Sequence, residues 1–473
     1  MPLESSELLS RSARSRPASA IRSLLPLEKK PNMISLLAGK PNPNGFPFES
    51  ITLQLKPSAE AGSKPSGEPM EITIKGSQLE KALQYGSSAG DEGLLGEVDK
   101  ILSRVHHRTR GDGQPAGEFG LTLGNGSQDL LSKAISVLFD PEDTILVESP
   151  VYPGVLPELV THKVQICSVE SDEQGLSAKN LRETLQSWKS SEKTKHLKFP
   201  KAVYTVPTGA NPAGTTASTE RKREILAIAR EFSVLVLEDD PYYFVTFENL
   251  TEDASSPERA LSYFELENEQ GSEWGYGYVL RFESFSKILS AGVRLGFSVG
   301  PKPLIDAMVA LTASTNLHAS GASQAIAGEL IQYWGVDGFL RHVTNVARMY
   351  KERRDMFGRQ LDTILGGESE MPLATYVTPV AGMFYWIKLH LPPTPEAPEG
   401  DSYQVISQKA LEFGVLAMPG AAFFADQRKT PYVRASFSLI QPDEAREALF
   451  RLRKAVLSAW EDAGYETVPR ISS

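Results

Sequence analysis

Cysteine is almost absent from the 473-residue sequence, in which Cys167 is the only one. A single cysteine excludes an intrachain disulfide framework and a cysteine-based metal cluster, so we expect no metal site of that kind. It is typical of a reducing compartment, and we expect a cytoplasmic protein, with a mitochondrial location left open. Cys167 lies in the apolar-leaning run VQICSV and is predicted to be a core residue.

Long apolar runs and excess positive charge are also lacking. No run approaches the roughly 20 apolar residues that span a bilayer, so no membrane is expected as a partner. The formal net charge of -10 argues against nucleic acid as a partner. Residues 1–32 are rich in arginine and serine, as transit peptides are, but Glu4 and Glu7 count against that interpretation. The absence of an apolar h-region argues against secretion.

What remains is the composition of an ordinary globular protein, with 41% hydrophobic and 23% charged residues. From Gly120 onward, short β-favouring runs alternate with segments of helical periodicity. Continuous apolar runs such as SVLVLEDD are typical of parallel strands covered on both faces. The alternation predicts an α/β fold with a mostly parallel sheet.

Three parts are expected along the chain. Residues 1–75 are predicted to form an N-terminal arm and part of a small domain, and residues 76–340 a large domain. After about residue 340, a long helix and the runs MFYWIKLHL and PYVRASFSL predict a smaller α+β domain over 341–473. Residues 56–78 read as a surface loop. The pair His106-His107 reads as a solvated helix end rather than a metal site, because adjacent helical residues face different ways.

Polar residues stand where several predicted strands end. Lys287 follows the strand-like run YVLRF, and a lysine there serves as a Schiff-base residue or is simply a surface lysine. Asp239 follows a buried run and has two interpretations. Either it pairs with a ring nitrogen or it lies in a solvated turn. The helix opening Ser127-Gln128 offers free N–H groups to an anion or is a plain helix start.

Four other residues have an ordinary interpretation when each is taken alone. Asn211, in NPAG, reads as a turn residue, and Tyr152 and Tyr242 read as core or rim aromatics. Arg294 alone would be a surface arginine. Taken together and in this order, however, these groups match the needs of one cofactor. Pyridoxal phosphate requires a lysine for its aldehyde, an acid for its ring nitrogen, a ring to stack on and an anion cradle.

The combination SFSK-x6-R with NPAG and EDDPYY, together with MISLLAGKPNPNGFPF, ALQYGSSAG, GNGSQDLL, AGMFYW and YVRASFS, resembles the class I aminotransferases. Within that family the sequence is most similar to fungal aromatic and kynurenine/2-aminoadipate aminotransferases. The resemblance runs from about Arg14 to the last helix. It implies fold type I, with pyridoxal 5'-phosphate bound on a seven-stranded type of sheet in the large domain.

The resemblance also implies which residues meet the cofactor. Lys287 would bond to the cofactor aldehyde and carry the substrate proton, and Asp239 would keep the ring nitrogen protonated. Asn211 and Tyr242 would bind the ring oxygen, and Tyr152 would stack on the ring. The phosphate would be held by Ser127, Gln128, Ser284, Ser286 and Arg294. Tyr85 would reach the phosphate of a partner subunit, so a homodimer is expected.

Substrate residues follow from the same resemblance. Arg434 would bind the α-carboxylate, a pairing that suits the planar guanidinium. Arg22 would meet the distal end of the substrate, and Gly39 and Asn211 would border it. Two positions depart from the family pattern. Lys40 stands where a small or apolar residue is usual, and Ala213 replaces the threonine of NPTG.

The implied activity is transfer of an amino group from an aromatic or 2-aminoadipate-type L-amino acid to a 2-oxo acid such as 2-oxoglutarate, by a ping-pong mechanism. An aminotransferase dedicated to secondary metabolism, a lyase and a ligand-sensing module on the same fold are the alternatives. A short, proline-broken N-terminal segment and a negative net charge argue against a DNA-binding module. Arg434 together with Lys287 fits transamination best.

Overall fold

The computed structural model describes residues 3–17, 24, 27, 30–37, 39–56, 70–113, 118–250, 257–269, 276–368 and 371–465. Within these ranges an eight-stranded sheet has the order β3-β10-β9-β8-β7-β4-β5-β6. Its strands are β3 (Phe119–Gly124), β4 (Thr144–Ser149), β5 (Gln165–Asp172), β6 (Gly175–Leu176), β7 (Ala202–Thr205), β8 (Leu235–Asp239), β9 (Val279–Ser284) and β10 (Gly296–Pro301). The expected α/β fold with a mostly parallel sheet is confirmed.

Strand pairing brings several strand ends to one edge of this sheet. Strands β5, β4, β7, β8 and β9 pair in parallel along the sheet. Strand β10 runs antiparallel to both β3 and β9, and Gly296 is paired with Gly124 on one side and with Ser284 on the other. The C-terminal ends of β3 and β9 therefore lie on either side of the same residue.

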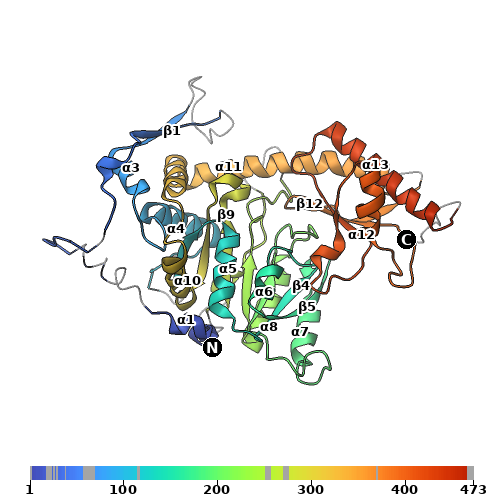
Figure 1. The fold of residues 1–473 in the computed structure, drawn as a ribbon, viewed down its shortest axis with the longest axis horizontal. Helices are drawn as coiled ribbons and strands as arrows, with labels where there is room; N and C mark the ends of the chain where they lie inside the picture. Colours follow the sequence, from blue (N-terminus) through green and yellow to red (C-terminus); the bar gives the residue numbers. More distant parts are fainter. Residues whose placement is uncertain are drawn as a thin grey trace.

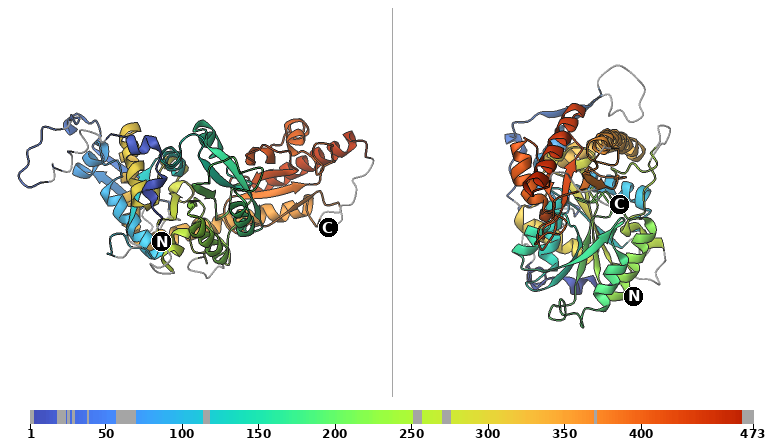
Figure 2. Two further views of the ribbon diagram at one scale, coloured as in Figure 1. Left: turned by 90° about the horizontal axis from the view of Figure 1, so that it is seen from below. Right: turned by 90° about the vertical axis from the view of Figure 1, so that its right-hand side faces the viewer.

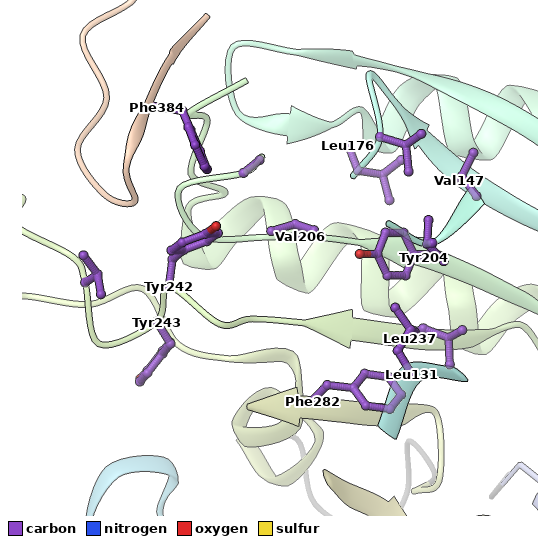
Figure 3. Packing of buried hydrophobic residues seen from close by; sticks show 14 of the residues in the cluster. Leu131, Val147, Leu176, Tyr204, Val206, Leu237, Tyr242, Tyr243, Phe282 and Phe384 are labelled. Carbon is purple, nitrogen blue, oxygen red and sulfur yellow. The ribbon is translucent and has the colours of Figure 1, made fainter. Parts of the chain in front are cut away.

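Every residue of six strands is buried: β3, β4, β7, β8, β9 and β10. Burial of both strand faces is expected where helices cover both sides of the sheet. The helices of this part are α4 (Glu92–His106), α5 (Ser127–Leu138), α6 (Leu156–Thr161), α7 (Ala178–Gln186), α8 (Thr219–Phe232), α9 (Tyr263–Glu269) and α10 (Lys302–Thr315). The periodic runs at 127–138 and 219–232 form helices as predicted. Figure 3 shows Leu131 of α5 packed near Leu237 and Phe282 of the sheet.

A smaller antiparallel sheet, in the order β11-β12-β14-β13, lies at the C-terminal end of the molecule (Figures 1 and 2). Its elements are β11 (Ala374–Tyr376), β12 (Phe384–Leu389), α12 (Ser402–Gln404), the π-helix η9 (Val405–Ala410), β13 (Met418–Pro419), the 3-10 turn η10 (Gly420–Phe423), β14 (Tyr432–Ser436) and α13 (Pro442–Asp462). The long α11 (Gly321–Ile364) runs from the large sheet to this layer, with a break at Gly335. The predicted boundary at residue 340 falls inside α11, and the three-part division stays a prediction.

The N-terminal residues form small elements and a hairpin. They are η1 (Ser5–Leu8), α1 (Arg11–Ser15), η3 (Pro43–Gly45), β1 (Ser50–Gln54), β2 (Glu71–Lys75) and α3 (Gly76–Leu83). Ser10 is fully buried, and its N–H donates to the carbonyl oxygen of Val137 at the end of α5. The hairpin of β1 and β2 projects from the end of the molecule opposite the smaller sheet (Figure 2).

Two local expectations are wrong. The loop predicted over 56–78 is wrong from residue 71 onward, where β2 and the start of α3 lie, because the alternating run EITIK places Ile72 and Ile74 on a buried face. Residues 57–69 of that loop lie outside the described residues. His106 is not solvated. It is fully buried, 2.9 Å from the Ser262 hydroxyl, whereas His107 ends α4 in the left-handed conformation and is exposed. The two side chains face different ways, so one ring lies in the core and the other is exposed.

Candidate active site

Most residues predicted to meet the cofactor stand at one edge of the large sheet. Asp239 is the last residue of β8, and Lys287 ends the 3-10 turn η7 (Phe285–Lys287) directly after β9. Asn211 lies in the loop after β7, Tyr152 follows β4, and Ser127 opens α5 after β3. The parallel sheet therefore gathers groups that are far apart in the sequence.

Lys287 is half-buried in a turn with several anchors. The Ser284 hydroxyl accepts a hydrogen bond from the N–H of Ser286. The Nε2 atom of His342, on α11, lies 2.6 Å from the carbonyl oxygen of Ile288. Burial lowers the pKa of the Lys287 ammonium, and the nearby charge of Arg294 lowers it further. Both effects favour the neutral amine, the form that attacks a carbonyl carbon.

A cradle for an anion lies next to this turn. Gly126, immediately before α5, has a φ of 90°, and a β-carbon there would come within 2.6 Å of the Arg294 Nη2 atom. Arg294 donates to the Ser286 hydroxyl at 3.2 Å and to the Asn125 carbonyl at 3.1 Å. The first N–H groups of α5, from Ser127 onward, lie next to Arg294 and Gly126. A helix start, a guanidinium and a hydroxyl in one place fit a phosphate group.

Asp239 has the arrangement that a protonated ring nitrogen requires. Its Oδ2 atom accepts a hydrogen bond of 2.6 Å from the hydroxyl of Tyr204, and its Oδ1 atom is buried without a partner in the structure. Burial raises the pKa of Asp239 to about 7, although the hydrogen bond from Tyr204 opposes that shift. A buried acceptor without a donor is costly. The pyridinium N–H of pyridoxal phosphate would satisfy it, so the residues present fit this cofactor.

Arg434 and Asn211 come from opposite parts of the chain, 223 positions apart. The Arg434 Nη1 atom donates to the Asn211 Oδ1 atom at 2.9 Å. The guanidinium lies over the rings of Phe384, at 4.3 Å, and Phe423, at 5.2 Å. Its Nε atom is buried without a hydrogen-bond partner in the structure. One edge of this guanidinium is therefore fixed, while another donor remains for a carboxylate.

The two predicted aromatic residues also lie at this edge. Tyr242 is buried, and its ring meets the ring of Phe384 edge to face, with centroids 6.2 Å apart (Figure 3). Burial raises the pKa of the Tyr242 hydroxyl, as it does for the half-buried Tyr152. The Gln128 side chain donates to the Gly154 carbonyl at 2.8 Å, which ties the start of α5 to the turn that carries Tyr152.

Three predicted residues are not part of this cluster of described side chains. Tyr85, just after α3, is 55% exposed, and Gly39 is exposed with no atom within 4 Å of a β-carbon built on it. Arg22 lies outside the described residues. Tyr85 and Gly39 thus lie on a surface that this chain alone leaves open, and their roles stay predictions.

Sequence reasoning missed the residues that support the predicted ones. Tyr204 lies in YTVP, just before the NPAG loop, and Phe384 lies in AGMFYW. AGMFYW is one of the stretches that carried the resemblance and YTVP lies just before another, but neither residue received a role. The signal was weak because an aromatic residue in an apolar strand is normally a core residue.

Two classes of site find no support in the part of the chain that the structure describes. No helix there is long and apolar enough to cross a bilayer. Nor do three or more histidine, cysteine, aspartate or glutamate side chains gather there in a way that would hold a metal ion.

Comparisons with known proteins point to one family. The family model described as "Aminotransferase class I and II" matches residues 90–452. Aminotransferase tdiD from Emericella nidulans is 39% identical over 92% of this chain and 91% of its own length. The mitochondrial kynurenine/alpha-aminoadipate aminotransferase of Bos taurus is 34% identical over 91% of this chain and 93% of its own. The crystal structure of the aromatic aminotransferase Aro9 from Candida albicans matches with a TM-score of 0.82 and 26% identity, covering 97% of this chain and 98% of that one.

Proposed function

Because this chain belongs to the class I and II aminotransferases, we propose that it transfers the amino group of an aromatic or 2-aminoadipate-type L-amino acid to 2-oxoglutarate or a similar 2-oxo acid. The chain is a transaminase and its cofactor is pyridoxal 5'-phosphate. The substrate class rests on the names of similar proteins, which include an aromatic and a kynurenine/alpha-aminoadipate aminotransferase. One observation carries the proposal: Lys287, Asp239 and the anion cradle at the start of α5 lie at the same edge of the large sheet.

Cofactor binding is assigned to the residues of that edge. Arg294, Ser286 and the first N–H groups of α5 hold the phosphate, in line with their arrangement around Gly126. Asp239 Oδ1 would accept a hydrogen bond from the protonated ring nitrogen. Tyr242 and Asn211 donate to the ring oxygen, and Tyr152 covers one face of the ring. When bound, pyridoxal phosphate supplies an electron sink for the electron pair released at the substrate Cα atom.

Lys287 and Arg434 act on the substrate itself. Arg434 binds the α-carboxylate through the donors that Asn211 leaves unused, which orients the Cα–H bond. Lys287 Nζ would take the proton from Cα and return it to the bound cofactor. Burial and the charge of Arg294 lower the pKa of Lys287, which favours the neutral amine that a general base requires. The amino group would stay with the cofactor when water releases the 2-oxo acid, and it would pass to the second 2-oxo acid when the steps run in reverse.

The remaining parts of the proposal concern assembly and location. We assign Tyr85 to the phosphate site of a second copy, which agrees with its exposed side chain and makes the active unit a homodimer. Sedimentation of the purified protein tests this, because a monomer that is fully active would contradict it. A cytoplasmic location is proposed as well and is tested by cell fractionation.

The test is a spectral titration of the purified holoenzyme with single amino acids in the absence of any oxo acid. We expect phenylalanine, tyrosine, tryptophan, kynurenine or 2-aminoadipate to bleach the visible absorption band of the bound cofactor and to release the matching 2-oxo acid. Glutamate and leucine serve as comparison donors. Release of an amine or of pyruvate and ammonia instead would indicate a decarboxylase or a lyase.

Substitution of Lys287 provides the matching mutational test. Lys287→Ala should abolish turnover and leave the circular dichroism spectrum unchanged, because the base and the covalent attachment point are lost together. Lys302→Ala is the control, since Lys302 is an exposed lysine on α10 paired with Asp306. A folded Lys287→Ala protein that turns over at the rate of Lys302→Ala would refute the proposed mechanism.

A further inference from the structure

Tyr204 is a fully buried tyrosine on β7, the strand next to β8, which ends in Asp239. In the register of these strands Tyr204 is paired with Leu237, two residues before Asp239. Side chains two positions apart on a strand share a face, so Tyr204 and Asp239 lie diagonally opposite on one face of the sheet. Figure 3 shows the Tyr204 hydroxyl directed along β7 toward the end of the sheet where Tyr242 lies.

We propose that Tyr204 is a positioning residue for the reaction, because its hydroxyl holds Asp239 ionised through Oδ2 and leaves Oδ1 for the cofactor ring nitrogen. The hydrogen bond is 2.6 Å long, in the range of charge-assisted O–H bonds to a carboxylate. The inference rests on the proposed function, since it concerns the same cofactor site.

The two oxygens of Asp239 differ in their hydrogen bonding. Oδ2 has a donor, whereas Oδ1 is buried without one in the structure. One proton is shared between the Asp239 carboxyl group and a ring nitrogen facing Oδ1. A donor on Oδ2 stabilises the carboxylate and therefore shifts this proton to the nitrogen. The ring accepts electrons well only in its protonated form, so the tyrosine favours catalysis without touching the substrate.

The surroundings make this donor necessary. Asp239 is buried, and burial is the largest influence that raises its pKa. The carboxylates of Asp240 and Glu283 raise it further, while Arg281 lowers it. Burial keeps the pKa of Tyr204 well above its ordinary value, so the hydroxyl remains a donor. Without this bond a neutral Asp239 facing a neutral ring nitrogen becomes favoured.

On the neighbouring strand β4, a second buried carboxyl group fixes the end of β7. Glu148 of β4 lies 2.8 Å from both the Thr205 hydroxyl and the backbone N–H of Val206. Burial raises the pKa of Glu148 to about 8, and the charge of Asp239 raises it as well. At neutral pH Glu148 is therefore mostly uncharged. Glu148 thus holds the end of β7 that directly follows Tyr204 without adding a further negative charge near Asp239.

The experiment compares the wild-type holoenzyme with Tyr204→Phe, which keeps the ring and removes the hydroxyl. The matched control is Tyr376→Phe. The hydroxyl of Tyr376, on β11 of the smaller sheet, also donates to an aspartate, Asp362 of α11, at 3.0 Å. The first measurement is the 15N NMR signal of the cofactor ring nitrogen against pH. We expect Tyr204→Phe to lower the pH at which that nitrogen loses its proton. 3-Fluorotyrosine at position 204, a stronger donor of similar shape, should raise it.

The second measurement is steady-state kinetics in a double-mutant cycle with Asp239→Asn. The bond lost in Tyr204→Phe should lower kcat about 10- to 100-fold, as for a hydrogen bond to a charged group, with the donor KM changed less than about threefold. In the Asp239→Asn background the same change should alter kcat less than about threefold.

Two results would overturn the inference. One is a ring-nitrogen signal that is the same in wild type, Tyr204→Phe and the fluorotyrosine protein. The other is an equal loss of kcat with and without Asp239→Asn, which would mean that Tyr204 does not act through Asp239. If the wild-type protein transaminates, either result overturns this inference alone. A wild-type protein that takes up no pyridoxal phosphate overturns the proposed function as well.

Discussion

Arg281 offers the sharpest test of how the large sheet is held together beneath the site. Its side chain is fully buried on β9 and pairs with Glu238 at 2.7 Å, with Asp240 at 3.0 Å and with Glu283. These acids are sequence neighbours of Asp239 and Ser284. Because neighbouring residues alternate along a strand, their side chains point to the face of the sheet opposite to that of Asp239. Arg281→Met keeps much of the volume of the side chain and removes its charge.

The expected cost follows from the burial of all the partners. Removing one member of a buried ion pair costs about 3–5 kcal/mol, because the remaining charge has neither water nor a counter-ion. Three carboxylates lose a partner here, so we expect the upper end of that range. Arg223→Met is the control, since Arg223 pairs with Glu269 at 2.8 Å and both side chains are about one-third exposed. Arg223→Met should lower the free energy of unfolding by about 0–1 kcal/mol.

The deficit of Arg281→Met should depend on pH. Burial raises the pKa of Glu238 and of Glu283 above the ordinary value, and the charge of Arg281 opposes both shifts. Removing that charge raises both pKa values further. A carboxyl group whose pKa is raised by folding stabilises the fold in its protonated form, and this stability is lost as the pH rises through the folded-state pKa. The deficit should therefore be larger at pH 8 than at pH 5.

The assay is urea unfolding of the cofactor-free proteins, followed by tryptophan fluorescence at pH 5 and at pH 8. The free energies of unfolding of Arg281→Met and Arg223→Met are each compared with wild type. A deficit of less than about 1 kcal/mol for Arg281→Met would refute the argument from burial. A deficit that stays constant between the two pH values would refute the assignment of the cost to unpaired carboxylates.

Two further predictions concern ligand binding. Arg434→Lys should raise KM for the amino donor about 10- to 100-fold with a smaller change in kcat, because lysine lacks the fork that binds Asn211 and a carboxylate together. An unchanged KM in steady-state kinetics would contradict this role. Gly126→Ala should lower the affinity for pyridoxal phosphate at least tenfold, because φ is 90° and the new methyl group would meet Arg294 at 2.6 Å. Equilibrium dialysis measures the affinity of Gly126→Ala for pyridoxal phosphate. An affinity equal to that of the wild type would show that the cradle does not hold the phosphate.

The sequence by itself determined the fold class and most of the groups at the sheet edge. Apolar runs with polar ends placed Asp239 and Lys287 at strand ends, because a parallel strand buried on both faces leaves its polar residues where it emerges. The helix at 127–138 followed from its periodicity in the same way. These features are local, and the motifs that carry the family resemblance lie within them.

Only the tertiary structure decided which groups meet. Tyr204 and Asp239 are 35 positions apart and are joined by the register of β7 and β8. Arg434 reaches Asn211 because the smaller sheet lies against the loop after β7. His106 was expected in water and is in the core, because the direction of a side chain at a helix end depends on what packs there. Strand register and the contact of the two sheets are long-range properties, and no short stretch of the sequence encodes them.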